Sequence, residues 1–170
     1  MYSEDVKKWL ETAGYTKPNS FGINDDNKKK VELSINLIQE ELDELKKAVA
    51  TNNNVEILDA IIDLKWVINN FIHFTGATED ILNKISEEVS KSNWSKYCTS
   101  HEEAHETLKL YRARQHPDKM GELILAYYSK HEISDDKIIY VIKREHDDKI
   151  LKSYKYKPVN IKKILNNYGI

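Results

Sequence analysis

The segment that most constrains the fold of this chain is 55–74, which is apolar on nearly all sides of the helix it predicts. Its apolar residues are Ile57, Leu58, Ile61, Ile62, Leu64, Trp66, Val67, Ile68, Phe71 and Ile72. A helix that is apolar all round must be covered on several faces. One small domain offers too little cover, so we expect a mainly α helical bundle that is completed by homo-oligomerisation through this helix.

A second long helix is predicted directly before it, over residues 29–50. The stripe expected to be buried lies at helical spacing and consists of Ile35, Ile38, Leu42, Leu45 and Val49. The Thr-Asn-Asn-Asn link at 51–54 is very short. Such a link favours two antiparallel helices that lie side by side.

Shorter elements flank this pair of helices. A short helix is expected at 3–13, and further helices begin after Thr78 and after Ser100, both of which are capping residues. Ser100 and Glu103 have the spacing of a capping box.

The last third of the chain has a different character. The β-branched segment 137–144 reads as a strand, 145–148 as a turn, and 149–156 as the returning strand. We therefore expect a single domain over residues 1–170. Its helical core covers about 29–115, and a small C-terminal β-hairpin with a basic tail covers about 122–170.

Composition excludes several classes of protein. The 170 residues carry 26 Lys and Arg against 28 Asp and Glu, for a net charge of −2. This balance argues against nucleic-acid binding, which requires a basic surplus. No uninterrupted apolar run reaches the roughly 20 residues of a membrane span. Cys98 is the only cysteine and no secretion signal is apparent, so a cytoplasmic protein that binds no membrane is expected.

The small net charge hides two opposed clusters. Residues 36–63 hold seven acids and two lysines, whereas residues 149–163 hold six lysines and no acid. An acidic region and a basic region in one chain are compatible with a cation and an anionic ligand. They are also compatible with ordinary solvated faces.

The acids of the two long helices fall at helical spacing. The first helix carries Glu40, Glu41 and Glu44, and the second carries Glu56, Asp59 and Asp63 as one stripe in an apolar helix. An antiparallel pair would bring both sets together, and so many carboxylates repel unless cations lie between them. Oxygen ligands of this kind suit Mg²⁺, with Mn²⁺ as a possible substitute. The acids of the first helix fit a solvated surface equally well.

Glu-x-x-Glu followed by Glu-x-x-Asp resembles the all-α NTP pyrophosphatases, the MazG-like and phosphoribosyl-ATP pyrophosphohydrolase-like group. Asp63, the Ser-Asn-Trp-Ser-Lys segment 92–96 and the segment 147–158 match motifs of a MazG-like subgroup in the same order. Trp94 stands where Met is commoner in that subgroup, and Asp148 stands where Gly is usual.

The resemblance implies an enzyme that hydrolyses nucleoside triphosphates between the α- and β-phosphates, as a dimer or a dimer of dimers. By the same resemblance, the Mg²⁺ ligands are Glu41, Glu44, Glu56 and Asp59. Glu40 and Asp63 are outer ligands or orient the attacking water, and Glu41 is counted with them among the catalytic residues. The expected substrate contacts are Asn93, Lys96, Lys149, Lys152 and Tyr156. A helix C-terminal cap for Asn93 and Lys96, and a solvated strand edge for the other two lysines, remain open.

Two rival functions stay open beside free nucleoside triphosphate hydrolysis. One is phosphoribosyl-ATP hydrolysis, and the other is a helical interaction protein without catalysis. Two sequence motifs are discounted. His-Glu-Glu-Ala-His at 101–105 matches a zinc-protease signature, but its flanking residues are polar. His-Pro-Asp-Lys at 116–119 matches the loop of J-domain proteins, but the rest of the J-domain pattern is missing. No residue pattern identifies the base of the nucleotide.

Overall fold

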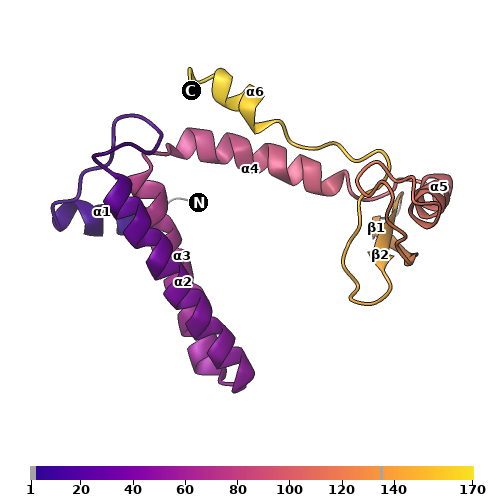
Figure 1. Cartoon of the computed structure of the whole chain (residues 1–170), viewed down its shortest axis with the longest axis horizontal. Helices are drawn as coiled ribbons and strands as arrows, with labels where there is room; N and C mark the ends of the chain where they lie inside the picture. The colour runs from indigo at the N-terminus through magenta and orange to yellow at the C-terminus, as the bar shows by residue number, and fades with distance from the viewer. Residues whose placement is uncertain (1–2, 135) are drawn as a thin grey trace. The chain divides into compact units, whose positions relative to one another are not determined.

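The computed structural model describes residues 3–134 and 136–170, and it is mainly helical with one two-stranded antiparallel sheet (Figure 1). In chain order the elements are α1 (Glu4–Thr12), α2 (Lys28–Ala50), α3 (Asn54–Phe74), α4 (Glu79–Trp94), α5 (His101–Arg112), β1 (Ala126–Ser134), β2 (Lys137–Arg144) and α6 (Ile161–Asn166). The mainly α fold with a small C-terminal hairpin is thus confirmed. No helix in the described ranges has the length and apolar character needed to cross a membrane.

The contacts within the chain divide it into two compact units. Met1–Asn83 with Leu165–Ile170 forms the first unit, and Lys84–Ile164 forms the second. The division falls within α4 and groups α5 with the hairpin.

The first unit is built on the helical hairpin of α2 and α3, which lie side by side (Figure 1). Asn52 adopts a left-handed conformation in the link, with φ 51°, which Asn tolerates better than most residues. Asn53 then caps α3, because its side-chain oxygen accepts hydrogen bonds from the N–H groups of Val55 and Glu56. The predicted tight link is confirmed.

The core of the first unit gathers at the end of the hairpin that lies away from this link. Its buried residues are Val6, Leu10, Val31 and Phe74, with Trp66 and Phe71 packed against them. Asn27, also buried, donates hydrogen bonds to the carbonyl groups of Gly22 and Phe74. The bond to Phe74 ties the loop before α2 to the end of α3, whereas the bond to Gly22 lies within that loop.

The expected buried stripe of α2 is wrong within a single chain. Ile35 and Val49 are 52% and 55% exposed, Leu42 is exposed, and Ile38 and Leu45 are only half-buried. The small residues Ser34 and Ala48 are buried in their place. Small side chains let the two helix backbones approach closely, so the larger side chains lie outside the contact.

Gly76 ends α3 in a position that only glycine fits. Its φ is +73°, and a Cβ there would lie 2.4 Å from the backbone oxygen of Ser20. Gly14 has a similar φ of +82°, but a Cβ added there would have no other atom within 4 Å.

We therefore expect Gly76→Ala to destabilise the protein by about 3 kcal/mol, from left-handed strain and a backbone clash together. Gly14→Ala is the matched control and should cost about 1 kcal/mol, from strain alone. Urea unfolding followed by circular dichroism measures both. Equal losses in the two variants would show that the clash with Ser20 relaxes without cost.

The second unit packs α5 against the hairpin of β1 and β2. Its core consists of Cys98, Ala104, Leu108, Tyr111, Ile124, Ala126, Ile142 and Leu151. The predicted strand 137–144 is confirmed as β2, but its partner is β1 rather than the segment 149–156. That segment makes only one isolated bridge to β2, between Lys143 and Ile150.

The segment 149–156 fails to form a strand because two α5 side chains and the backbone of Lys96 bond to its backbone groups. The Tyr111 hydroxyl donates to the carbonyl of Lys152 at 3.0 Å and accepts from the N–H of Lys152 at 3.2 Å. The Tyr154 N–H donates to the side chain of Thr107, and the Ser153 N–H donates to the carbonyl of Lys96. Long-range contacts thus replace the ladder that the local sequence predicts.

Candidate functional site: an acidic face and a basic segment

The predicted metal ligands lie on the α2–α3 hairpin. Glu40, Glu41 and Glu44 come from α2, whereas Glu56, Asp59 and Asp63 come from α3. Within the single chain, Glu41 is half-buried and the other five are exposed. The expected burial of the α3 stripe is therefore wrong for one chain, because α2 covers only one side of α3.

Glu41 lies at the electrostatic centre of this acidic face. Partial burial and the charges of Glu44, Asp63, Glu40 and Asp59, in that order, raise its pKa above the ordinary value for Glu. Carboxylates from both helices are therefore close enough to repel one another. This coupling agrees with the prediction that the antiparallel pair brings the two acidic sets together.

A hollow of about 440 Å³ extends the acidic face toward the link between the helices. Glu44 and Glu56 line it from opposite helices, together with Lys47, Ala48, Thr51 and Asn53. Glu44 thus belongs both to the surroundings of Glu41 and to the hollow that contains Glu56. The six acids form one continuous acidic face.

The donor chemistry of the acidic face suits a hard divalent cation, because every donor is a carboxylate oxygen. In the part of the chain that the structure describes, no three His, Cys, Asp or Glu side chains converge closely enough to hold a metal ion. Exposed carboxylates can rotate toward a cation, and the raised pKa of Glu41 shows that positive charge between them would relieve repulsion. The residues therefore fit Mg²⁺ in their donor chemistry, and holding the ion would require these exposed side chains to rotate toward it.

The predicted substrate contacts all belong to the second unit. Asn93 lies near the end of α4 and is exposed, Lys96 is half-buried, and Lys149 is exposed in the turn after β2. Lys152 and Tyr156 are neighbours, because the Lys152 ammonium lies 4.5 Å from the centroid of the Tyr156 ring. The Tyr156 hydroxyl accepts a hydrogen bond from Ser92 at 3.0 Å.

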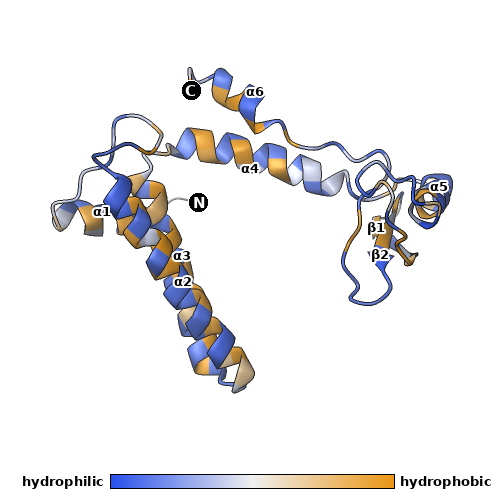
Figure 2. Ribbon diagram, in the orientation of Figure 1, coloured by the Kyte–Doolittle hydropathy of each residue, from blue (hydrophilic) through white to orange (hydrophobic). Residues whose placement is uncertain are grey.

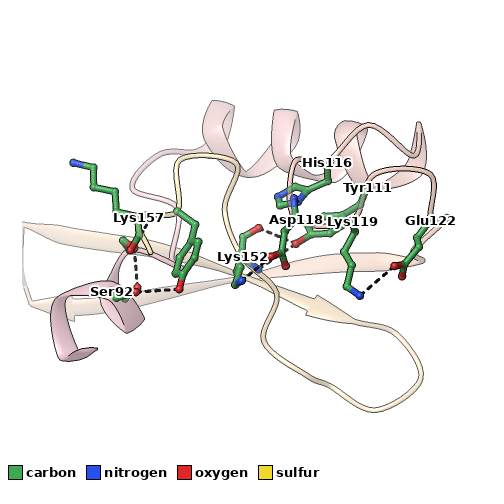
Figure 3. Close-up of polar contacts among 10 residues, drawn as sticks. Ser92, Tyr111, His116, Asp118, Lys119, Glu122, Lys152 and Lys157 are labelled. Carbon is green, nitrogen blue, oxygen red and sulfur yellow. Dashed lines mark hydrogen bonds and ion pairs between the residues drawn. The ribbon is translucent and has the colours of Figure 1, made fainter. Parts of the chain in front are cut away.

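Lys152 is held by residues that sequence reasoning did not select (Figure 3). Its ammonium lies 2.6 Å from the Asp118 carboxylate, and both backbone groups of Lys152 bond to the Tyr111 hydroxyl. Burial raises the pKa of Tyr111 far above its ordinary value, so this hydroxyl stays protonated and can donate. Asp118 and Tyr111 are remote from Lys152 in the sequence, and no local spacing signals their contact with it.

The His-Pro-Asp-Lys motif acquires a structural role in this arrangement. The buried His116 ring stacks on Tyr111, with centroids 3.8 Å apart, and its Nδ1 accepts the N–H of Asp118 at 3.1 Å. Burial lowers the pKa of His116, which keeps Nδ1 available as an acceptor. The motif therefore orients Asp118, which in turn binds Lys152.

The His-Glu-Glu-Ala-His motif lies in the first turns of α5. His101 and His105 are exposed, and their rings stack 6.3 Å apart, with His101 also against Tyr128 and Tyr140. Ser100 caps α5 as predicted, by accepting the N–H of Glu103. The Glu103 carboxylate does not return to the Ser100 N–H as a capping box requires, but accepts from Thr99 and Ser153.

Comparison with known families assigns residues 11–93 to a family. Residues 11–93 match the family model described as phosphoribosyl-ATP pyrophosphohydrolase (PRA-PH). The match covers α2, α3 and nearly all of α4, and it includes all six acids of the acidic face. No curated protein and no solved structure matches the chain significantly.

The region 11–93 is thus a PRA-PH domain, a member of the all-α NTP pyrophosphatase superfamily, which includes the MazG-like proteins. This confirms the resemblance found in the sequence. The family identifies a pyrophosphohydrolase, a hydrolase that acts on acid anhydrides. The segment 147–158, which resembles a closing motif of a MazG-like subgroup, lies beyond the matched residues.

Proposed function

We propose that this protein is a Mg²⁺-dependent nucleoside triphosphate pyrophosphohydrolase. It cleaves the bond between the α- and β-phosphates of (d)NTPs, so that water adds to the α-phosphorus and pyrophosphate leaves with the bridging oxygen. The observation that carries the proposal is the mutual repulsion of carboxylates from α2 and α3 around Glu41, within a domain of a pyrophosphohydrolase family.

In this proposal Glu41, Glu44, Glu56 and Asp59 hold Mg²⁺. The cation would supply neutralisation of the charge that develops on the phosphates. Glu40 and Asp63 orient the attacking water and accept its proton, since both contribute to the potential at Glu41 and are not among the ligands.

The basic segment supplies the phosphate contacts. Lys149 is exposed and free of a side-chain acid partner among the described ion pairs, and Lys152 carries a second ammonium group. A triphosphate that binds Lys152 competes with the Asp118 carboxylate for the same ammonium group. Asn93, Lys96 and Tyr156 complete the proposed substrate contacts around the sugar and the phosphates.

Pyrophosphate release tests the function directly. The purified chain is incubated with each dNTP, each NTP and phosphoribosyl-ATP, with Mg²⁺, with Mn²⁺ and with EDTA. We expect monophosphate and pyrophosphate in equal amounts from at least one (d)NTP, only when a divalent cation is present. Turnover of phosphoribosyl-ATP alone would establish the rival substrate, and no release from any compound would favour the interaction protein.

We also propose that the protein is a homo-oligomer, a dimer or a dimer of dimers, that covers the apolar faces of α2 and α3. Leu58 and Ile62 lie one turn apart on α3 and are 66% and 59% exposed, while Ile35 and Val49 on α2 are also exposed. Figure 2 shows hydrophobic stretches along the hairpin of α2 and α3. An apolar surface of this extent is typical of a protein–protein interface.

Leu58→Asp should therefore convert the oligomer to a monomer, because it places a charge in the apolar contact. Asn36→Asp, on the exposed side of α2, is the control and should leave the assembly unchanged. Light scattering after size-exclusion chromatography gives the mass of each variant. A wild-type chain that is already monomeric at micromolar concentration would contradict the proposal.

A further inference from the structure

A hollow lies beside the C-terminal half of α4, and none of the residues that line it belongs to either hydrophobic core. Ser86, Val89, Ser90 and Asn93 line it from one helix face, and Trp94 and Tyr97 complete it. Its volume is about 310 Å³. Small-molecule sites in proteins begin at about this size.

Trp94 is the largest side chain of this hollow and remains 55% exposed. The Tyr97 ring meets it edge-on, with centroids 5.5 Å apart and planes at 86°, so the indole is supported on one side. The ammonium of Lys137 lies 5.8 Å from the Trp94 centroid. An exposed indole and hydroxyl and amide groups therefore share one hollow, and a cation lies near the indole ring.

We infer that this hollow binds the base and sugar of a nucleotide, with the base stacked on Trp94. The inference rests on the proposed function, and it deepens it by assigning a base subsite. Every nucleobase has a π-face that can stack on an indole, and the Asn93 amide and the two serine hydroxyls can pair with the polar edges of a base or a sugar. The positive charge of Lys137 favours an anionic ligand over a neutral one.

The lining of the hollow favours a nucleotide over a helix of a second copy. Ser86, Ser90 and Asn93 occupy three of its six lining positions. An apolar helix packed on them would leave their polar groups buried without partners, at a cost in free energy. A heterocycle and a ribose instead offer donors and acceptors to the same groups.

The test measures equilibrium binding of AMP, GMP, CMP and UMP to the full-length chain in EDTA, by isothermal titration calorimetry. We expect at least one monophosphate to bind, Trp94→Ala to weaken that binding at least about fivefold, and Trp94→Phe to stay within about twofold, because stacking survives in phenylalanine. Trp9→Ala is the matched control, since Trp9 is 54% exposed and also meets another aromatic ring edge-on. It should bind as the wild type does.

Two results would overturn the inference: no binding of any monophosphate to the wild type, or unchanged affinity in Trp94→Ala. A loss of binding in Trp94→Ala that accompanies a change in oligomer mass would also overturn it, because the hollow would then be an interface. Pyrophosphate release keeps the two proposals apart. If Trp94→Ala hydrolyses the substrate with an unchanged KM, only the proposed base subsite is contradicted. If monophosphates bind through Trp94 but no triphosphate is hydrolysed, only the proposed function is contradicted.

Discussion

Glu41→Gln is expected to reduce pyrophosphate release at least about 1,000-fold while the fold remains intact, because it removes the central carboxylate of the proposed Mg²⁺ site. Asp59→Asn should have the same effect from the facing helix. The measurements are kcat with the best substrate at saturating Mg²⁺ and the far-ultraviolet circular dichroism spectrum. Retained activity in either variant would contradict the ligand assignment.

Asp43→Asn provides the matched control for this experiment. Asp43 lies on the same helix, two residues from Glu41, but it pairs with Lys46 at 2.8 Å and is absent from the charges that act on Glu41. We expect its activity to stay within about twofold of the wild type, since an exposed ion pair of this kind contributes little. A loss as large as that of Glu41→Gln would point to a general effect of charge rather than to ligation.

The raised pKa of Glu41 adds a stability signature to the same variant. The folded chain binds this proton more tightly than the unfolded chain, whose Glu has a pKa of 4.5. Without metal, the free energy of unfolding should therefore fall as the pH rises from 4.5 through the raised pKa. Glu41→Gln lacks this decrease, and at neutral pH without metal it should melt at the wild-type temperature or above it. The wild type alone should gain stability when Mg²⁺ is added.

Glu103→Ala is the second substitution with a large expected effect, a loss of about 3 kcal/mol in the free energy of unfolding. The Glu103 side chain is 5% exposed and accepts hydrogen bonds from the N–H and hydroxyl of Thr99 and from the hydroxyl of Ser153. Alanine leaves the buried Ser153 hydroxyl without its acceptor. It also releases the chain on which Lys152 is carried, so KM should rise together with the loss of stability.

Glu102→Ala is the matched control for Glu103, because it changes the neighbouring, exposed carboxylate of the same helix turn. It should cost less than about 1 kcal/mol. Urea unfolding of both variants gives the comparison, and equal costs would show that the Glu103 bonds are replaced by water.

The pH dependence of Glu103 has the opposite sign to that of Glu41. Burial raises its pKa, but the hydrogen bonds from Ser153 and Thr99 and the charge of Lys155 outweigh burial, so the pKa lies below its ordinary value. Its contribution to stability is therefore present above pH 4.5 and is lost as the pH falls through the lowered pKa.

The positions of the helices could be predicted because capping residues and the spacing of apolar residues are visible within a few positions of the sequence. Thr78, Asn53 and Ser100 cap the helices that they precede, and the buried residues Ala104, Leu108 and Tyr111 recur on α5 at helical spacing. The turn 145–148 and the strand before it were equally clear. Each of these depends on contacts within a few residues, which the sequence displays directly.

Pairings between segments that are distant in the chain could not be predicted from local sequence in this way. The strand that joins β2 comes from 126–134 rather than from the predicted return 149–156. Tyr111 and Thr107 hold the backbone of 149–156 away from the sheet. The buried stripe of α2 also failed, because helix periodicity identifies an apolar face but does not say which molecule covers it.

By itself, the sequence determined the family, the two acidic helices and their antiparallel link, since spacing along a helix fixes which side chains share a face. Only the tertiary structure decided that partial burial and the neighbouring carboxylates raise the pKa of Glu41, and that Asp118 and Tyr111 hold Lys152. It also decided that Trp94, Tyr97 and Lys137 meet beside one hollow. Those contacts join residues that are distant in the chain or on different elements, and their energies depend on burial and distance, which no sequence pattern specifies.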